Sequence, residues 1–139
     1  MKVLILEDEF LLAMMLAEEV VEAGHTVLGP VSSVAEALRL AEATPPDLAF
    51  LNITLSGGEL GTEAAVVLKE RWDVLCLFVS GSRGMVEEYR SVAVGILEKP
   101  YSGDTVHDVL RLLEKLMDGE AVDLIPAGLT LFTKQATHA

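Results

Sequence analysis

Cysteine, aromatic side chains and positive charge are all scarce in this sequence. Its 139 residues contain one cysteine, 5% aromatic residues, and 10 Lys and Arg residues against 22 Asp and Glu residues. Cys76 cannot form an intramolecular disulfide, and its apolar surroundings, VLCLFV, predict a core position in a protein from a reducing compartment. The chain is still long enough to fold as one domain without a metal or a disulfide.

Basic clusters and long apolar runs are absent as well. The net charge is −12, and no stretch rich in Lys or Arg offsets it, so the chain repels phosphate backbones and anionic lipid surfaces. No apolar run approaches the 18 residues or so of a transmembrane helix, and the start MKVLILEDE is too short for a signal-peptide core. We therefore expect a cytoplasmic protein that binds neither nucleic acid nor membranes.

The loops that bind nucleotides or carry a catalytic serine are also missing. Neither G-x-G-x-x-G nor G-x-x-x-x-G-K-[ST] follows the first predicted strand, which argues against a nucleotide-binding module. The stretch SGSRG does not match G-x-S-x-G, and no pattern of Asp or Glu and His follows it as a hydrolase triad requires.

What the sequence does contain is a strict alternation of short apolar runs and helical stretches. The alternation predicts a parallel sheet covered by helices on both faces, because each parallel connection needs a crossover. In such sheets the ligand site lies beyond the carboxyl ends of the strands. The predicted strands are Val3–Leu6, Thr26–Val31, Leu48–Ile53, Val74–Ser80 and Val94–Glu98, and the predicted helices are Phe10–Ala23, Val34–Ala43, Thr62–Arg71, Met85–Ser91 and Thr105–Met117.

Polar residues stand where four of these strands end. The first is followed by Glu7, Asp8 and Glu9, the third ends near Asn52, the fourth ends in Ser80, and the fifth is followed by Lys99 and a proline. Each has an ordinary explanation: acids favour a helix amino end, Asn and Ser favour turns, and most lysines are solvated. Together they place acids, a hydroxyl and one cation at one edge of one sheet, as a Mg²⁺ site would need.

The segments VLILEDE, DLAFLNITL, LFVSG and EKPY, in this order, resemble the receiver domain of two-component response regulators over about residues 1–118. The resemblance implies a three-layer, flavodoxin-like α/β fold, with a five-stranded parallel sheet in the order 2-1-3-4-5 and five helices. It makes residues 119–139 a C-terminal tail or extension.

The resemblance also assigns roles to residues. Glu7 and Asp8 would hold Mg²⁺ together with Asn52 and the backbone carbonyl of Thr54. Asn52 would stand at the position of the Asp that accepts a phosphoryl group from a histidine kinase, with Ser80 and Lys99 gathering its oxygens. The implied function is signalling through protein partners, a histidine kinase or another signalling protein, without enzymatic turnover, and a homodimer is left open.

Three residues or segments depart from the receiver pattern. An amide at Asn52 is a far poorer nucleophile than a carboxylate, so ordinary phosphorylation should not occur. Ile96 stands where many receivers carry an aromatic switch residue, while Tyr101 is a nearby aromatic of unassigned role. The loop after Asn52, LSGGELG, contains three glycines and is expected to be longer or looser than usual.

The amide has consequences for the acids around it. It removes one charge from three close carboxylates, which should stabilise the unliganded fold and weaken Mg²⁺ binding, although its oxygen could still coordinate a cation. We hypothesise that Lys99 pairs with Asp8 or Glu7, with Asn52 hydrogen-bonded between them, so that one conformation is favoured without a phosphate signal.

Several alternatives stay open at this point. Asn52 is either native or the result of an Asp-to-Asn change in an ordinary receiver. A metal-dependent phosphatase-like α/β hydrolase is the alternative function, although it too would need a nucleophilic carboxylate. The apolar segment LIPAGLTLF of the tail packs either on the domain or on another subunit, or forms a loose terminus. By resemblance, partners would contact the surface formed by residues 85–91, 94–98 and 105–117.

Overall fold

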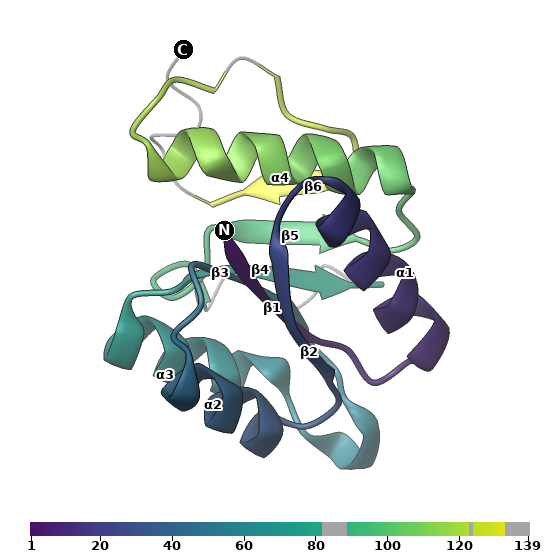
Figure 1. The fold of residues 1–139 in the computed structure, drawn as a ribbon, viewed down its shortest axis with the longest axis vertical. Helices are drawn as coiled ribbons and strands as arrows, with labels where there is room; N and C mark the ends of the chain where they lie inside the picture. Colours follow the sequence, from purple (N-terminus) through teal and green to yellow (C-terminus); the bar gives the residue numbers. More distant parts are fainter. Residues whose placement is uncertain (82–88, 123, 133–139) are drawn as a thin grey trace.

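Five strands of the computed structural model coincide with the apolar runs of the sequence (Figure 1). The structure describes residues 1–81, 89–122 and 124–132. Its strands are β1 (Lys2–Leu6), β2 (Thr26–Val31), β3 (Leu48–Asn52), β4 (Leu75–Ser80), β5 (Gly95–Glu98) and β6 (Leu129–Leu131). Its helices are α1 (Phe10–Glu22), α2 (Val34–Ala43), the short 3₁₀ helix η1 (Ser56–Gly58), α3 (Gly61–Trp72) and α4 (Gly103–Met117).

The sheet has the strand order β2-β1-β3-β4-β5-β6. The first five strands are parallel and follow the predicted order, which confirms the predicted flavodoxin-like topology. The prediction of five strands was wrong by one, because β6 pairs antiparallel with β5. Three residues are too short a run to identify as a strand. Gly95 permits the close pairing, since a Cβ there would lie 2.3 Å from the backbone oxygen of Thr130.

The four α-helices of the described residues match predicted ones, with ends that differ by two residues or fewer. The hydroxyl of Ser33 accepts a hydrogen bond from the backbone N–H of Glu36 and so caps the amino end of α2. The predicted helix over residues 85–91 lies largely outside the described residues. None of the described helices is long and apolar enough to cross a membrane.

Two helices cover each face of the sheet (Figure 1). Helices α1 and α4 pack on one face against Val3, Ile5 and Phe50, while α2 and α3 pack on the other face against Leu4 and Leu51. Alternate residues of the same strand thus enter different cores, which explains why β3 is buried along its whole length. Cys76 lies in the second core, and burial raises the pKa of its thiol to about 12.

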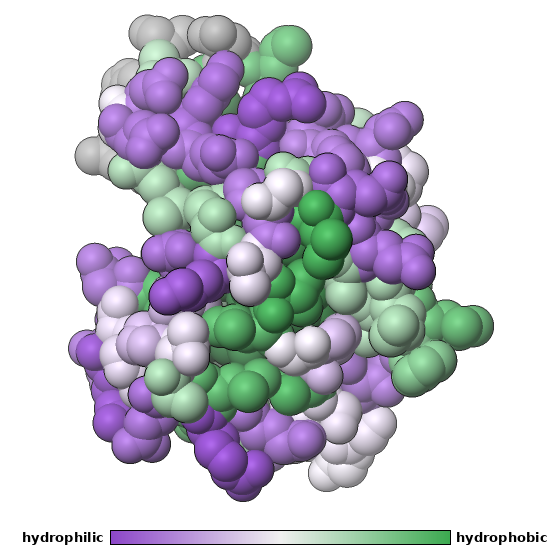
Figure 2. Space-filling view, viewed as in Figure 1, coloured by the Kyte–Doolittle hydropathy of each residue, from purple (hydrophilic) through white to green (hydrophobic). Residues whose placement is uncertain are grey.

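The hydrophilic surface is interrupted along one side of the molecule. Figure 2 shows apolar side chains gathered around the edge strand β2, between hydrophilic groups above and below. At the start of α1, Phe10 and Leu11 are also exposed, by 73% and 80%. Although the chain is strongly acidic, the β2 edge of the sheet thus has an apolar surface.

The described part of the C-terminal segment packs on the domain, which agrees with the first of the three alternatives for LIPAGLTLF. Val122 and Leu129 are 6% and 7% exposed and join the core beneath α4. Two backbone hydrogen bonds, from Glu98 N–H to Gly128 O and from Phe132 N–H to Val94 O, tie the segment to both ends of β5. The edge of β5 is therefore covered by the chain's own residues.

Leu129→Ala should lower the free energy of unfolding by about 2 kcal/mol, because it removes a buried side chain from the core. Thr130→Ala, at an exposed position of the same strand, should lower it by less than about 1 kcal/mol. Equilibrium unfolding in urea measures both values. Equal effects of the two substitutions would contradict the packing of β6 on the domain.

Candidate functional site

The carboxyl ends of β1, β3, β4 and β5 bring the predicted polar residues to one edge of the sheet. Glu7 follows β1, Asn52 and Ser80 end β3 and β4, and Lys99 follows β5. Glu7, Asn52 and Ser80 are 5%, 6% and 9% exposed, which is unusual for polar side chains. The backbone N–H of Lys99 donates to the oxygen of Ser80 at 2.8 Å, which joins the ends of β4 and β5.

Lys99 pairs with Glu7, as the sequence predicts. Its Nζ lies 2.9 Å from Glu7 Oε1 and 3.9 Å from Oε1 of Glu9, and the side chains of Lys99 and Glu7 are only 17% and 3% exposed. The Lys99–Pro100 peptide bond is cis. Because both charges are shielded from water, loss of either one would leave the other buried without its partner.

Asn52 lies between the two acids, and its amide nitrogen faces them. Nδ2 donates toward three oxygens: the backbone oxygen of Thr54 at 2.8 Å, Asp8 Oδ1 at 3.0 Å and Glu7 Oε2 at 3.3 Å. The hypothesis that Asn52 hydrogen-bonds between the acids beside the Lys99 pair is thus confirmed in its geometry. An N–H₂ group has two hydrogens, so the three acceptors share them.

Every carboxylate oxygen of Glu7 and Asp8 has a donor from the protein. Glu7 Oε2 also accepts the backbone N–H of Glu9 at 3.0 Å, and Asp8 Oδ2 accepts Ser56 N–H at 2.9 Å and the Ser56 hydroxyl at 2.6 Å. Burial by itself would raise the pKa of Asp8, but the hydrogen bonds from Ser56, the local backbone and Asn52 outweigh it and lower that pKa. These hydrogen bonds therefore favour the ionised form of Asp8.

The loop after Asn52 is tied to the site by several contacts, and the expectation that it is longer or looser than usual stays a prediction. Gly57 and Gly58 have φ of 80° and 82°, which allow the tight 3₁₀ turn that brings Ser56 to Asp8. A bridge between Thr54 and Leu60 and a 2.7 Å hydrogen bond from Gly61 N–H to the oxygen of Ile53 close the loop. Ser56 was missed as a site residue, because Ser before two glycines indicates only a turn.

The aromatic residue near the site is Tyr101, while Ile96 is 2% exposed in the core under α2 and α3. Burial, and after it the charges of Glu7 and Glu9, raise the pKa of Tyr101 to about 12. Its hydroxyl is buried, with no hydrogen-bond partner among the residues that the structure describes. Tyr101 therefore stays neutral beside the acids at any ordinary pH.

Mg²⁺ is the cation that the resemblance implies for this site, and two carboxylates with a backbone carbonyl are oxygen ligands of the kind it takes. Here, however, those three oxygens converge on the amide nitrogen of Asn52. In this arrangement the residues do not fit a divalent cation. The predicted coordination by the oxygen of Asn52 stays a prediction, since the amide would have to turn over.

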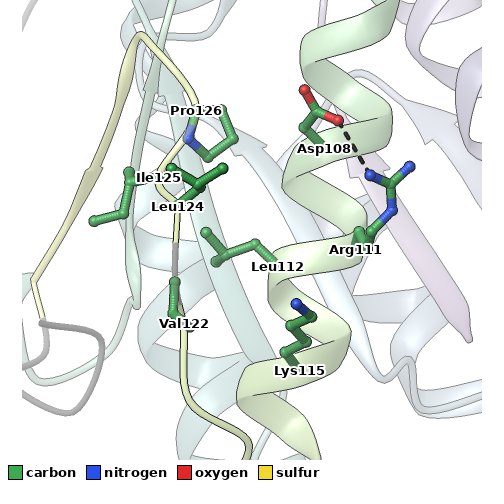
Figure 3. Close-up of a pocket in the computed structure, with 8 residues that line it drawn as sticks. All are labelled: Asp108, Arg111, Leu112, Lys115, Val122, Leu124, Ile125 and Pro126. Atoms are coloured by element: carbon green, nitrogen blue, oxygen red, sulfur yellow. Dashed lines mark hydrogen bonds and ion pairs between the residues drawn. The ribbon is translucent and has the colours of Figure 1, made fainter. Parts of the chain in front are cut away.

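A pocket lies away from the strand-end residues, between α4 and residues 122 and 124–126 (Figure 3). It has a volume of about 390 Å³, and Leu112 of α4 faces Val122 across it. Asp108 and Arg111 form an ion pair of 3.5 Å at its rim. None of the strand-end residues lines this pocket, so the candidate functional site remains the cluster of Glu7, Asp8, Asn52 and Lys99.

Comparison with known proteins finds two bacterial regulators that are similar to this chain. It is 33% identical over 116 residues to the transcriptional regulatory protein PdtaR of Mycobacterium tuberculosis, a match that covers 81% of this chain and 55% of PdtaR. It is 31% identical over 112 residues to the phyllosphere-induced regulator PhyR of Methylorubrum extorquens, over 78% of this chain and 42% of PhyR. The chain thus spans about half the length of these relatives. No family model matches the sequence.

The fold gives the same assignment. The signal receiver domain of a modulated diguanylate cyclase from Desulfovibrio desulfuricans G20 superimposes with a TM-score of 0.71 at 29% identity, over 84% of this chain and 97% of that chain. A parallel sheet in this order, with acids after β1 and a Lys after β5, defines a flavodoxin-like receiver domain. The chain belongs to the receiver domains of two-component response regulators.

Gly61→Ala should destabilise the protein by about 2 kcal/mol or more, because its Cβ would lie 2.0 Å from the backbone oxygen of Asn52. Gly81→Ala is the matched control: it follows β4 and meets no atom within 4 Å. Urea unfolding of the two variants compares them. A stable Gly61→Ala protein would contradict the close approach of the loop to β3.

Proposed function

We propose that this chain is a receiver that signals by binding a protein partner, without accepting a phosphoryl group at Asn52. The observation that carries the proposal is the place of Asn52 at the end of β3, between Glu7 and Asp8 and beside the Lys99 ion pair. This is where the receiver pattern has its phosphoacceptor carboxylate. A carboxylate oxygen can attack phosphorus, whereas the amide oxygen carries no full negative charge.

Two groups beside Asn52 are of the kinds that phosphoryl transfer uses. Lys99 is one cation at the cluster, and Ser80 ends the neighbouring strand with its side chain almost buried. Both would gather phosphoryl oxygens if a nucleophile were present. In this proposal the loss of activity comes from the residue at position 52, whether Asn52 is native or an Asp-to-Asn change.

Mg²⁺ would be held by Glu7, Asp8 and the Thr54 carbonyl in a version of the chain with an acid at position 52. With Asn52 in place the cation should bind far more weakly, because the site has one charged ligand fewer. In addition, the amide of Asn52 is hydrogen-bonded to the oxygens of Glu7, Asp8 and Thr54 that would bind the cation. The chain itself would catalyse no turnover. The phosphatase-like alternative gains no support from the relatives, which are regulators.

The partner we propose is a histidine kinase or another signalling protein, with a second copy of the chain as the alternative. Of the surface formed by residues 85–91, 94–98 and 105–117, the first part lies largely outside the described residues, and the edge of β5 is occupied by β6. A partner of this chain would therefore contact the outer face of α4. We place the receiver domain at residues 1–118 and treat residues 119–139 as an extension that completes its sheet.

Intact-mass measurement after incubation with acetyl phosphate and Mg²⁺ tests the proposal. The unaltered chain should gain no phosphoryl group, whereas Asn52→Asp should gain one, because the substitution restores the nucleophile. Asn52→Asp combined with Lys99→Ala is the control, and should gain far less.

A phosphoryl group on the unaltered chain would show that Asn52 does not block the reaction. If Asn52→Asp gains none, Asn52 does not stand at an acceptor position and the proposal fails.

A further inference from the structure

We infer that the amide N–H₂ of Asn52 takes the place of the divalent cation in the acid cluster, so that the site is closed and the fold is indifferent to Mg²⁺. This inference rests on the proposed function, because it concerns the same receiver site. It goes beyond the missing nucleophile, because Asn52 would stand in place of the metal as well as of the phosphoacceptor.

The first argument is the point on which the oxygens converge. Oxygens of Glu7, Asp8 and Thr54 lie 3.3, 3.0 and 2.8 Å from one atom, Asn52 Nδ2. These are the three protein groups, besides the residue at position 52, that the resemblance assigns to the metal. A donor group with a partial positive charge thus stands at the centre of a set of metal ligands.

The second argument fixes which end of the amide faces the acids. Nitrogen and oxygen of an amide are told apart by the hydrogen bonds around them. With the amide turned over, its oxygen would face three other oxygens at 2.8–3.3 Å, none of which can donate. The acids and the carbonyl therefore require the N–H₂ group to point at them.

The third argument is charge. Glu7, Asp8 and Glu9 are the acids that follow β1. Among the described residues, Lys99 is the cation that pairs with these acids: its Nζ lies 2.9 Å from Glu7 and 3.9 Å from Glu9. A carboxylate at position 52 would add a fourth negative charge beside the buried Glu7, and like charges in a buried position repel strongly. An amide adds no charge, and its two hydrogens are directed at the oxygens that a cation would otherwise contact.

The fourth argument is access. All four oxygens of Glu7 and Asp8 accept hydrogen bonds or an ion pair from the protein, and Asn52 is only 6% exposed. A cation could enter only by displacing these donors and by shedding part of its own hydration shell, which Mg²⁺ does reluctantly. The amide would be left buried without its acceptors.

Thermal unfolding in EDTA and in 10 mM MgCl₂ tests the inference. Another group of possible metal ligands, Glu19, Glu22 and His107, lies between α1 and α4 with its ligand atoms within 4.8 Å of one another. The comparison is therefore made with His107→Ala in every protein. The chain that retains Asn52 should change its Tm by less than about 1 °C, because a ligand that does not bind the native state cannot stabilise it.

Asn52→Asp in the same background should have a lower Tm in EDTA and gain several degrees in MgCl₂, about the shift expected of a ligand at many times its Kd. Asn52→Ala, which removes the amide without adding charge, serves if Asn52→Asp fails to fold in EDTA. It should lose stability in EDTA and recover part of it with Mg²⁺.

The outcomes separate the two claims. If Mg²⁺ raises the Tm of the chain that retains Asn52 as much as it raises that of Asn52→Asp, the inference is overturned. The proposed function would still stand. If Mg²⁺ changes the Tm of neither Asn52→Asp nor Asn52→Ala, the inference and the assignment of the receiver site both fail. If Mg²⁺ leaves the Tm of the chain with Asn52 unchanged but raises the Tm of Asn52→Asp or Asn52→Ala, the result supports both the inference and the proposed function.

Discussion

Carboxylates that meet at the end of a buried parallel sheet repel one another unless something between them carries positive charge. In this protein the constraint is met by two groups from the protein itself, the ammonium of Lys99 and the amide N–H₂ of Asn52. The first neutralises Glu7, and the second joins Glu7 and Asp8 to the backbone at Thr54. The loop with Ser56, the end of β3 and the end of β5 are all positioned by these contacts.

The same network is the basis of our proposal that a chain of this family does not accept a phosphoryl group. The fold, the acids after β1 and the Lys after β5 are those of a receiver. The residue between them supplies hydrogen-bond donors where the receiver pattern has an acceptor of phosphate. Under the proposed function, these contacts would favour one conformation without phosphate.

Much of this could be predicted from the sequence. The alternation of apolar runs and helices predicts a parallel sheet covered on both faces, and the resemblance to receivers implies the strand order and therefore which strand ends meet. The Lys99–Glu7 pair followed from one cation facing several acids in that order. β6 could not be predicted, since three residues carry too little pattern and their pairing depends on Gly95 being small. Ser56 and the direction of the Asn52 amide depend on hydrogen bonds between distant segments, which spacing does not reveal.

The central claim, that the amide of Asn52 stands where a cation would, is tested most directly by the ¹⁵N–¹H NMR signals of that side chain, assigned by their loss in Asn52→Asp. We expect both N–H signals to keep their positions as MgCl₂ is added, and to exchange slowly with water because the group is buried and bonded. A saturable shift or loss of these signals with Mg²⁺ would show that the cation displaces the amide, and would contradict the account.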